Sequence, residues 1–419
     1  MIHIDKIKNI YFIGVGGIGM SAIARYFLSR GAKVSGYDKT VTPLTKQLEA
    51  EGIKIHYEDS IDLLDADAQI IIYTPAIPKD HQQLNWYRSK EYNIVKRSDV
   101  LQAITEKLFN ICVGGTHGKT TITSMIAHVL RHTGFGCNAF LGGISVNYNT
   151  NFWSSENNVC VVEADEYDRS FHKLSPDIAV ITSMDPDHLD IYGTAEAMQQ
   201  AFVEFAEKTK ENGVLIRKSN LNLLNNAKVS TQIAYSLNDT TANVYASNIK
   251  TKNGSYWFDV VINNEVIKDI NLNVGGLHNV ENAVVAITVA KQLNIEEQKI
   301  KEAVAAFKGV KRRFEYVLKN DQHIIIDDYA HHPAELNALI SGARNVFPEK
   351  KMTIVFQPHL YTRTRDLADG FAEALDKADE TILLPIYPAR ELPIDGVTSE
   401  MILRKMINQK KRLLDKEQL

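Results

Sequence analysis

The stretch from Gly114 to Thr121, with the sequence GGTHGKTT, constrains the fold more than any other part of the chain. A short apolar run at residues 108–113 precedes it, and residues 122–130 have apolar positions at helical spacing. The pattern predicts a strand, a glycine turn and a helix. Glycines let the backbone fold around an anion, helix amides point at it, and Lys119 and Thr120 suit phosphate and Mg²⁺. We interpret the stretch as a binding site for the triphosphate of ATP.

The full P-loop pattern has a glycine five positions before Gly118, where this sequence has Val113. The match is therefore to a shortened G-x-x-G-K-T form. An ordinary strand-to-helix turn would leave the order Gly-Lys-Thr-Thr unexplained. The residues that we assign to ATP here are Gly115, Thr116, His117, Gly118, Lys119, Thr120 and Thr121.

A second glycine-rich turn lies near the N-terminus. Residues 9–13 read as a strand, residues 14–19 have the sequence GVGGIG, and residues 20–29 read as a helix. The G-x-G-x-x-G spacing is that of a dinucleotide-binding turn, and Asp38 ends the next strand, at residues 33–37, where a ribose hydroxyl would be bound. Taken alone this predicts NAD, but the turn specifies only a diphosphate on a helix N-terminus.

The alternation of strand and helix continues to about residue 107, where we place the end of a first domain. Residues 68–73 form a predicted strand, and the loop Thr74-Pro75-Ala76 follows its carboxyl end, where open α/β sheets bind ligands. A further strand and helix are predicted at residues 94–98 and 100–106.

Polar side chains follow two predicted strands of a second domain. Glu163 comes directly after residues 158–162, and His188 lies in the loop after residues 178–182. Carboxylates at a strand end beside a phosphate loop are suited to hold Mg²⁺, and Glu163 is the first choice.

Residues 212–270 alternate short strands with polar turns, which predicts an antiparallel flank on the central sheet. A helix is predicted to start after Gly275-Gly276 and to run through Lys291. His278, Asn279 and Asn282 offer imidazole and amide groups that can read an adenine edge, although Asn279 also suits a plain helix cap.

A basic segment near residue 310 separates this pattern from a third. There, two predicted strands, residues 324–327 and 351–356, each run into a loop of histidine, tyrosine and arginine, which is the layout of a substrate site. A strand is also predicted at residues 381–384, and the charged tail, residues 405–419, is helix-prone. The predicted fold class is α/β with three domains: a Rossmann-like domain at 1–107, a central P-loop ATPase-like domain with a mainly parallel sheet at 108–309, and a Rossmann-like domain at 310–419.

Composition excludes several classes of function. The 419 residues include 47 basic and 51 acidic side chains, a formal charge of −4, so no basic surplus favours nucleic acid. No run of about 18 apolar residues predicts a membrane span, and the N-terminus has no signal-peptide core. Cys112, Cys137 and Cys160 are too scattered for a disulfide framework or a zinc site. We expect a cytoplasmic protein.

The motifs together resemble those of the Mur ligase family over nearly the whole chain. In order they are GVGGIG at 14–19, GTHGKTT at 115–121, EADE at 163–166, DHLD at 187–190, HNVENA at 278–283, DYAHHP at 328–333 and FQPH at 356–359. The last two favour the members that add L-alanine to UDP-N-acetylmuramate. In this family the first glycine turn binds a UDP-sugar rather than NAD.

The resemblance implies a role for individual residues. Lys119, His188 and Arg313 would act in catalysis, with Lys119 and Arg313 on the ATP phosphates. Thr120 and Glu163 would hold Mg²⁺, and His188 would ligate a second metal ion near the acyl phosphate. The other implied contacts are His278, Asn279, Asn282, Asp328 and His331 for ATP, Gly14, Gly16, Gly17, Ile18, Gly19, Asp38, Thr74, Pro75 and Ala76 for the UDP-sugar, and Tyr329 and Arg363 for alanine.

The implied reaction has two steps. The lactyl carboxylate of UDP-N-acetylmuramate attacks the γ-phosphate of ATP, and the amine of L-alanine then displaces phosphate from the acyl phosphate. No protein nucleophile is required, because a lysine, a helix N-terminus and Mg²⁺ stabilise the developing charge. The acyl phosphate needs shelter from water, so we expect the third domain to close about a hinge near Arg313. A monomer and a homodimer both suit this reaction.

Two features depart from the family pattern. Leu360 stands where the family commonly has a second arginine, so Arg363 would bind the alanine carboxylate alone. The family usually continues past the position of Leu419 through a glycine-rich strand end and a closing helix, so we expect a truncated third domain with an exposed sheet edge. The alternatives are a recycling ligase that attaches a tripeptide to the same nucleotide sugar, a truncated inactive homologue that binds UDP-sugar, and an NAD-dependent dehydrogenase.

Overall fold

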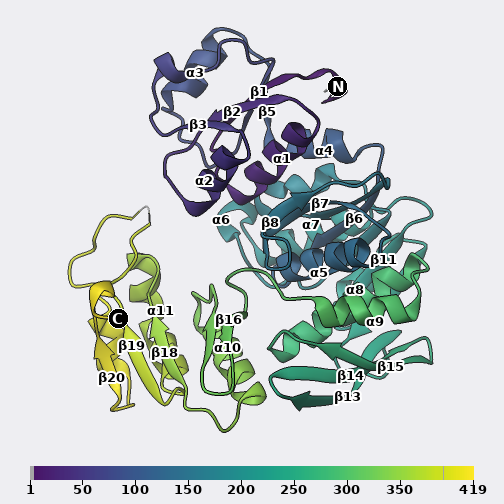
Figure 1. Cartoon of the computed structure of the whole chain (residues 1–419), viewed down its shortest axis with the longest axis vertical. Coiled ribbons are helices and arrows are strands. Elements are labelled where there is room, and N and C mark those ends of the chain that lie inside the picture. The colour runs from purple at the N-terminus through teal and green to yellow at the C-terminus, as the bar shows by residue number, and fades with distance from the viewer. Residues whose placement is uncertain (1–3, 390) are drawn as a thin grey trace. The chain divides into compact units, whose positions relative to one another are not determined.

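The computed structural model of the chain describes residues 4–389 and 391–419, and these residues contain four β-sheets (Figure 1). They divide into two units. Unit 1 consists of the residues up to Ser247 with Asp259–Ile270 and Glu281–Val310, and unit 2 consists of Asn248–Phe258, Asn271–Val280 and Lys311–Leu419. None of the helices in the described residues combines the length and the apolar character that a membrane crossing requires.

The first sheet of unit 1 is parallel, with the strand order β3-β2-β1-β4-β5. Its strands are β1 (Asn9–Ile13), β2 (Lys33–Tyr37), β3 (Lys54–His56), β4 (Ile70–Tyr73) and β5 (Ile94–Lys96). The helices between and after them are α1 (Ile18–Ser29), α2 (Pro43–Ala50), α3 (Gln82–Ser89) and α4 (Arg97–Thr105), and 3-10 turns lie at Ile4–Lys6 and Ile61–Leu63. The strands predicted at residues 9–13 and 33–37 are confirmed. The strand order reverses between β1 and β4, which is where doubly wound sheets bind ligands.

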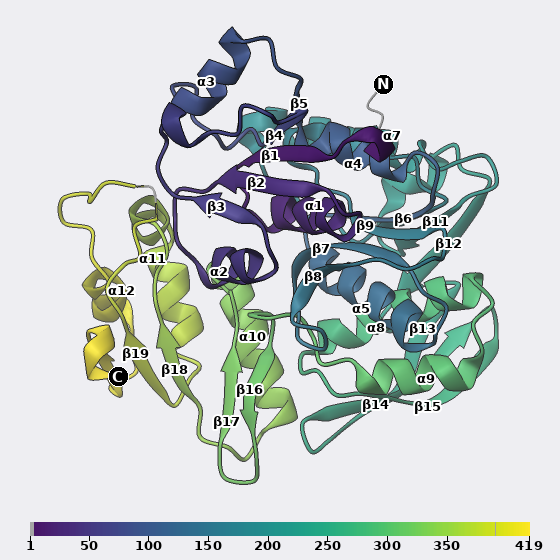
Figure 2. The same cartoon turned by 45° about the horizontal axis from the view of Figure 1, so that its top comes forward.

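The second sheet has ten strands in the order β15-β14-β13-β12-β11-β10-β6-β9-β7-β8. They are β6 (Phe109–Gly114), β7 (Asn138–Ser145), β8 (Thr150–Trp153), β9 (Val159–Glu163), β10 (Ile178–Ile181), β11 (Val214–Lys218), β12 (Thr231–Ser236), β13 (Val244–Lys252), β14 (Ser255–Ile262) and β15 (Glu265–Leu272). The helices are α5 (Lys119–His132), α6 (Leu189–Tyr192), α7 (Ala195–Ala206), α8 (Leu277–Gln292) and α9 (Glu297–Ala306), with 3-10 turns at Tyr167–Lys173 and Asn222–Asn226. The helix α5 packs on β6, β7 and β9 and contacts α9 (Figure 2).

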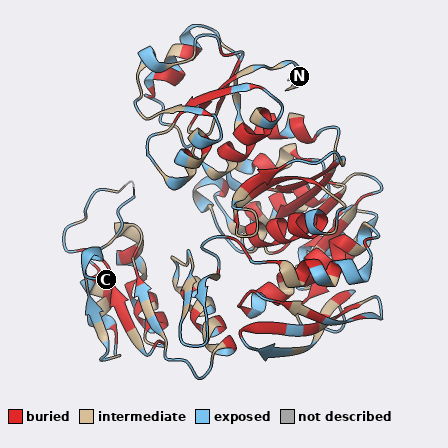
Figure 3. Cartoon of the chain, viewed as in Figure 1, coloured by how far each residue is buried: buried red, intermediate tan, exposed pale blue. Residues whose placement is uncertain are grey.

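The central strands of this sheet are buried from end to end. Every residue of β10 is buried, and so is every residue of β6 except the first. Figure 3 shows buried residues in red in the part of the sheet where Figure 1 labels β6 and β7. A parallel sheet covered on both faces has no solvent side, so its strands read as continuous apolar runs in the sequence. This is why the strands around the phosphate loop were predicted to within one or two residues.

The antiparallel flank predicted for residues 212–270 is wrong for its first strands. The strands β10 to β13 pair in parallel, each with the next in the chain. The link between β11 and β12, residues 219–230, includes a 3-10 turn and is long enough for the chain to return in the same direction. Alternating apolar residues identify the faces of a strand but not its direction.

Unit 2 contains two small sheets. The strands β16 (Glu315–Lys319) and β17 (Ile324–Asp327) are antiparallel, and β18 (Thr353–Phe356), β19 (Glu380–Leu383) and β20 (Lys411–Leu413) are parallel. The helices are α10 (Pro333–Val346), α11 (Tyr361–Leu375) and α12 (Glu400–Lys405), and a 3-10 turn lies at Lys416–Gln418. Within the described residues β17 pairs only with β16 and β18 only with β19, and a cavity of about 250 Å³ lies between β17 and β18. The edges of β17 and β18 beside this cavity are not the exposed edge expected from the sequence, which was placed beside a missing last strand.

The helix predicted for the tail is wrong. The helix α12 ends at Lys405, and the tail contributes β20, in which Leu413 pairs with the buried Leu383 of β19. Helix propensity is a weak preference for so short a charged segment, and pairing along the edge of β19 overrides it.

His128, in α5, should make the stability of unit 1 depend on pH. Its Nε2 lies 2.9 Å from the Ala303 carbonyl and its Nδ1 lies 3.0 Å from the Tyr148 hydroxyl, and burial lowers its pKa to about 4. Because the folded pKa lies below the unfolded value of about 6.5, stability is complete above about pH 6.5 and is lost as the pH falls toward 4. We expect the free energy of unfolding to fall by roughly 2 kcal/mol between about pH 7.5 and about pH 5.

Urea unfolding of the wild type and of His128→Gln at both pH values measures this effect. The variant keeps an amide that can hydrogen-bond to the same partners but has no proton to gain, so it should lose less stability. Equal losses in the two proteins would show that other groups cause the dependence.

Candidate functional site

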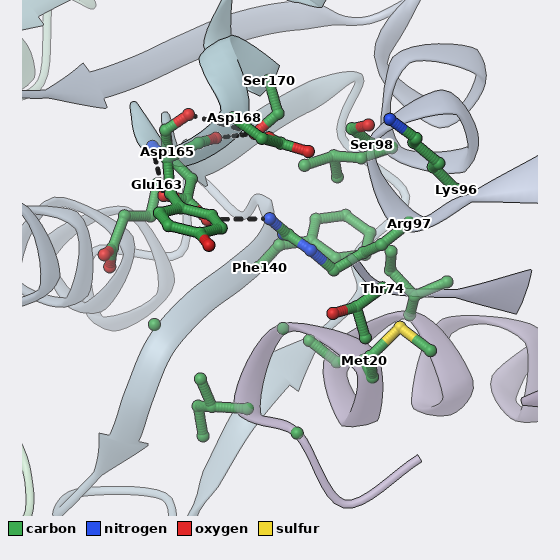
Figure 4. A pocket seen from close by; sticks show the side chains of 18 of the residues that line it. Met20, Thr74, Lys96, Arg97, Ser98, Phe140, Glu163, Asp165, Asp168 and Ser170 are labelled. Atoms are coloured by element: carbon green, nitrogen blue, oxygen red, sulfur yellow. Dashed lines mark hydrogen bonds and ion pairs between the residues drawn. The ribbon is translucent and has the colours of Figure 1, made fainter. Parts of the chain in front are cut away.

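A cavity of about 300 Å³ opens at the carboxyl edge of the first sheet of unit 1 (Figure 4). Its walls come from α1, the loop after β4, the start of α4, β7 and the segment after β9. Six residues predicted to bind the UDP-sugar line it, namely Gly17, Ile18, Gly19, Thr74, Pro75 and Ala76. Glu163 lines the same cavity. The structure therefore brings the first glycine turn and the candidate metal ligand to one space.

The other residues predicted to bind the UDP-sugar, Gly14, Gly16 and Asp38, take part in hydrogen bonds that hold the glycine turn in place. Asp38 Oδ2 accepts a hydrogen bond from the Gly16 N–H at 2.7 Å, and Asp38 Oδ1 accepts one from the Thr40 N–H at 3.1 Å. The N–H of Gly14 donates to the Tyr37 carbonyl at 2.8 Å. Asp38 thus closes the glycine turn, and its contact with a ribose stays a prediction.

The phosphate loop between β6 and α5 is held by the segment that follows β10. The Ser183 hydroxyl accepts a hydrogen bond from the His117 N–H at 2.8 Å and lies 2.8 Å from Thr116 Oγ1. Thr182 Oγ1 donates to the His117 carbonyl at 2.5 Å. A methyl group on Gly115, whose φ is 135°, would lie 2.0 Å from Thr182 Oγ1, so only glycine fits there. The loop is shaped by its neighbours as well as by its own glycines.

Lys119 is the first residue of α5, after Gly118, and its side chain is held over this loop. Its Nζ donates to the Gly115 carbonyl at 2.6 Å and lies 2.7 Å from Glu166 Oε1. The Glu166 side chain is 3% exposed, and within the described residues its Oε2 is buried without a hydrogen-bond partner. A buried carboxylate therefore fixes the ammonium where a phosphate oxygen would bind. Thr121 is buried in the first turn of the same helix.

Thr120 and Glu163, the predicted Mg²⁺ ligands, lie against two consecutive glycines of β7. A methyl group on Gly142 would lie 2.0 Å from Glu163 Oε2, and one on Gly143 would lie 2.9 Å from Thr120 Cγ2. Because Gly142 has no side chain, the Glu163 carboxylate lies directly against β7, and the Thr120 methyl group lies against the next residue, Gly143. In the described part of the chain, no three His, Cys, Asp or Glu side chains form a metal-binding group. One carboxylate and one hydroxyl still fit Mg²⁺, which commonly completes its shell with water and substrate phosphates.

His188 lies on the other side of Glu166. Its Nε2 is 4.0 Å from Glu166 Oε1 and 3.7 Å from Asp187 Oδ2, and its ring meets Tyr167 edge-on at 5.3 Å. The backbone of His188 has a φ of 49°, in the left-handed region. Glu166 Oε1 therefore lies within 4.0 Å of both the Lys119 ammonium and the imidazole.

The residues predicted to read adenine lie on α8. In unit 1, Asn282 reaches the phosphate loop, because a methyl group on Gly118 would lie 3.4 Å from its Oδ1. In unit 2, Asn279 is buried and its Nδ2 donates to the Gly275 carbonyl at 2.6 Å, while His278 is exposed. Asn279 therefore fastens the turn that begins α8.

In unit 2, Asp328 holds the backbone in place directly before β16. Its Oδ2 accepts a hydrogen bond from the Phe314 N–H at 2.7 Å, and its Oδ1 accepts one from the Ala330 N–H at 2.8 Å. Burial raises the pKa of Asp328, these two hydrogen bonds oppose the rise, and the charge of Arg313 opposes it further. Arg313 itself is exposed.

The predicted alanine-binding residues lie at the ends of β17 and β18. Tyr329 is 52% exposed, and its carbonyl lies 2.8 Å from His331 Nδ1. Arg363, in the first turn of α11, has Nη1 3.3 Å from His359 Nδ1. Leu360, at the N-cap of α11, has a φ of 71°. Arg363 and His359 form one polar group at the start of this helix.

Three residues at these sites were not assigned a role from the sequence. Arg97 lines the cavity of unit 1, Glu166 binds Lys119, and Ser183 holds the phosphate loop. Each follows the carboxyl end of a parallel strand by one to three residues. That position was the available signal, because ligands of α/β sheets bind at this edge.

Models of known families match three consecutive parts of the chain. The model described as Mur ligase family, catalytic domain, matches residues 9–108, and the Mur ligase middle domain matches residues 113–290. The model described as Mur ligase, glutamate ligase domain, matches residues 312–418, which is nearly the whole of the third domain that we expected to be truncated, so that expectation is not borne out.

Individual relatives match nearly the whole chain. The UDP-N-acetylmuramate--L-alanine ligase of Flavobacterium johnsoniae is 46% identical over 100% of this chain and 92% of its own. The crystal structure of the UDP-N-acetylmuramate-alanine ligase of Thermotoga maritima is 29% identical, with a TM-score of 0.84 over 97% of this chain and 90% of its own. A murein peptide ligase from Psychrobacter arcticus, 22% identical over 97% of this chain and 91% of its own, shares the fold at a TM-score of 0.70. The predicted three-domain α/β fold with mainly parallel sheets is confirmed.

Proposed function

The chain belongs to the Mur ligase family, and we propose that it uses ATP to join L-alanine to the lactyl carboxylate of UDP-N-acetylmuramate. Curated relatives at 45–47% identity over nearly the whole chain carry this activity in their names. The observation that carries the proposal is the cavity of unit 1, because it extends from the glycine turn at α1 to Glu163. With the diphosphate of a UDP-sugar at that turn, the cavity would leave room for the sugar between the turn and Glu163. ATP and UDP-sugars are cytoplasmic metabolites, so we assign the reaction to the cytoplasm.

The chemistry requires charge stabilisation rather than a protein nucleophile. A carboxylate is a poor electrophile, so the lactyl carboxylate first attacks the γ-phosphate, giving an acyl phosphate and ADP. The alanine amine then attacks the acyl carbon, and phosphate leaves. Negative charge develops on phosphoryl oxygens and then on the carbonyl oxygen, and Lys119 with the first amides of α5 would stabilise the phosphoryl charge.

Thr120 and Glu163 would hold Mg²⁺, with His188 at a second metal position. The assignment is supported by the packing of both side chains against the consecutive residues Gly142 and Gly143, which brings them to the same part of β7. When bound, Mg²⁺ would add positive charge at the phosphate oxygens.

Unit 2 would supply the remaining contacts. We assign Tyr329 and Arg363 to the alanine. The residues that we assign to the nucleotide are Arg313, Asp328 and His331 of unit 2, Asn282 of unit 1, and His278 and Asn279 at the start of α8. The chain passes from unit 1 to unit 2 for the last time after Val310, and Arg312 and Phe314 have φ values of 58° and 49°. We propose a hinge near Arg313, as expected from the sequence, whose closure would shelter the acyl phosphate from water.

Phosphate release tests the function directly. The protein is incubated with ATP, Mg²⁺ and UDP-N-acetylmuramate, without amino acid, with L-alanine, or with the L-alanyl-γ-D-glutamyl-diaminopimelate tripeptide. Alanine-dependent release establishes the proposal. Release that requires the tripeptide would identify a recycling ligase instead, and UDP-sugar binding without any release would identify an inactive homologue.

Arg363→Lys should raise the KM for L-alanine about tenfold while leaving the KM for ATP unchanged. Lysine keeps the charge but loses the planar, paired donors that match a carboxylate, a difference of about 1 kcal/mol or more. Arg365→Lys is the matched control, because Arg365 lies two residues further on, is half exposed and pairs with Asp366. Equal changes in the two variants would contradict the role of Arg363.

A further inference from the structure

Arg97 lies in the cavity of unit 1, between the first glycine turn and Asp165. It is the first residue of α4, directly after β5. A methyl group on Gly19 would lie 3.0 Å from Arg97 Nη1 and 3.4 Å from its Cζ, so the guanidinium rests on the first turn of α1. On its other side, Arg97 Nη2 lies 2.9 Å from Asp165 Oδ2 (Figure 4).

The first turn of α1 needs a cation if it binds a diphosphate. The turn contains no charged residue, and Gly17 at the N-cap makes no side-chain hydrogen bond to the helix amides. A helix N-terminus supplies only about half a positive charge, whereas a diphosphate ester carries about two negative charges. Lys96 and Arg97 both line the cavity, and Arg97 has its guanidinium against this turn, where its fork of donors matches two phosphate oxygens.

The ion pair between Arg97 and Asp165 is easily exchanged. The side chains are 21% and 42% exposed, and an ion pair this open to solvent contributes about 0–1 kcal/mol. Asp165 is also fixed in place without Arg97, because its Oδ1 accepts the Tyr167 N–H at 3.1 Å. The guanidinium can therefore leave Asp165 for a phosphate at little cost in free energy, while Asp165 stays in position.

We propose that Arg97 binds the diphosphate of the UDP-sugar, and that Asp165 is its counter-ion when no nucleotide sugar is bound. The assignment rests on the proposed function and adds a substrate-binding residue that touches the diphosphate rather than the reacting carboxylate. It predicts opposite effects for the two partners. Loss of Arg97 weakens binding of the nucleotide sugar, whereas loss of the Asp165 charge removes a competitor and strengthens it.

Calorimetric titration of the full chain with UDP-N-acetylmuramate and with UDP-N-acetylglucosamine tests the assignment. Both ligands carry the diphosphate, but only the first carries the lactyl carboxylate. Arg97→Gln should weaken both about 10- to 100-fold, the range expected for losing a charge-assisted hydrogen bond. Arg97→Lys should restore part of the loss, and Asp165→Asn should bind both ligands severalfold more tightly than the wild type.

Lys173→Gln is the matched control for a general loss of positive charge. Lys173 binds Asp99 Oδ1 and the Ser98 hydroxyl at the start of α4, outside the cavity lining. This variant should bind both ligands as the wild type does, and thermal unfolding verifies that every variant is folded.

The outcomes separate the inference from the function on which it rests. A loss confined to UDP-N-acetylmuramate would place Arg97 on the lactyl carboxylate and overturn the diphosphate assignment, as would unchanged binding by Arg97→Gln. If the wild type binds neither nucleotide sugar, the proposed function and this inference both fall. Alanine-dependent phosphate release by the wild type, together with normal binding by Arg97→Gln, would overturn the inference alone.

Discussion

Lys119→Ala should lower the rate of alanine-dependent phosphate release by about 10²- to 10³-fold. The ammonium lies over the phosphate loop at the N-terminus of α5, where charge develops on the transferred phosphoryl group, and removing one such donor commonly costs a factor of 10²–10³. The measurement is the initial rate of phosphate release at saturating ATP, UDP-N-acetylmuramate and L-alanine.

The same substitution should also destabilise the protein, which has to be separated from the catalytic effect. The Lys119 partner, Glu166, is 3% exposed, and removing one member of a buried ion pair leaves an uncompensated charge at a cost of about 3–5 kcal/mol. In Lys119→Ala/Glu166→Gln the remaining side chain is neutral, so stability should largely return while activity does not. Recovery of activity in the double variant would show that Lys119 is structural and would refute its catalytic role.

The sequence predicted most accurately those elements whose pattern depends on local structure. The strands β1 and β2 have the predicted bounds, and α5 begins at the lysine that ends the glycine turn. Apolar runs of strand length and glycine turns report directly on burial and backbone conformation. Strand direction depends on connections and on partners distant in sequence, and so the first strands of the flank at residues 212–270, and the tail that forms β20, were predicted wrongly.

The residues of the candidate site also differ in how far the sequence alone could identify them. The glycines and Lys119 could be identified because their spacing alone specifies a phosphate loop. Glu166 and Ser183 could not be ranked above neighbouring polar residues, because their roles depend on contacts made across the sheet. Asp38 has the spacing of a ribose ligand, and the structure adds a role that its spacing did not predict, because it accepts hydrogen bonds from the Gly16 and Thr40 amides.

Gly142→Ala should lower the rate by at least about 10²-fold, although Gly142 carries no functional group. The added methyl group would lie 2.0 Å from Glu163 Oε2 and 2.5 Å from Cδ, so the carboxylate has to move by an ångström or more. A displacement of that size in a catalytic constellation commonly costs about 10²-fold. The Mg²⁺ concentration that gives half-maximal phosphate release should rise as well, because Glu163 is the proposed ligand.

A double-mutant cycle decides whether Gly142 acts through Glu163. If the methyl group does harm only by displacing the carboxylate, then adding Gly142→Ala to Glu163→Ala removes nothing further, and the two effects are strongly non-additive. Additive losses would mean that the substitution damages β7 itself. Non-additivity together with an unchanged melting temperature would show that the bare glycine in β7 holds space for the carboxylate, a requirement that the chemistry of the Glu163 side chain alone does not reveal.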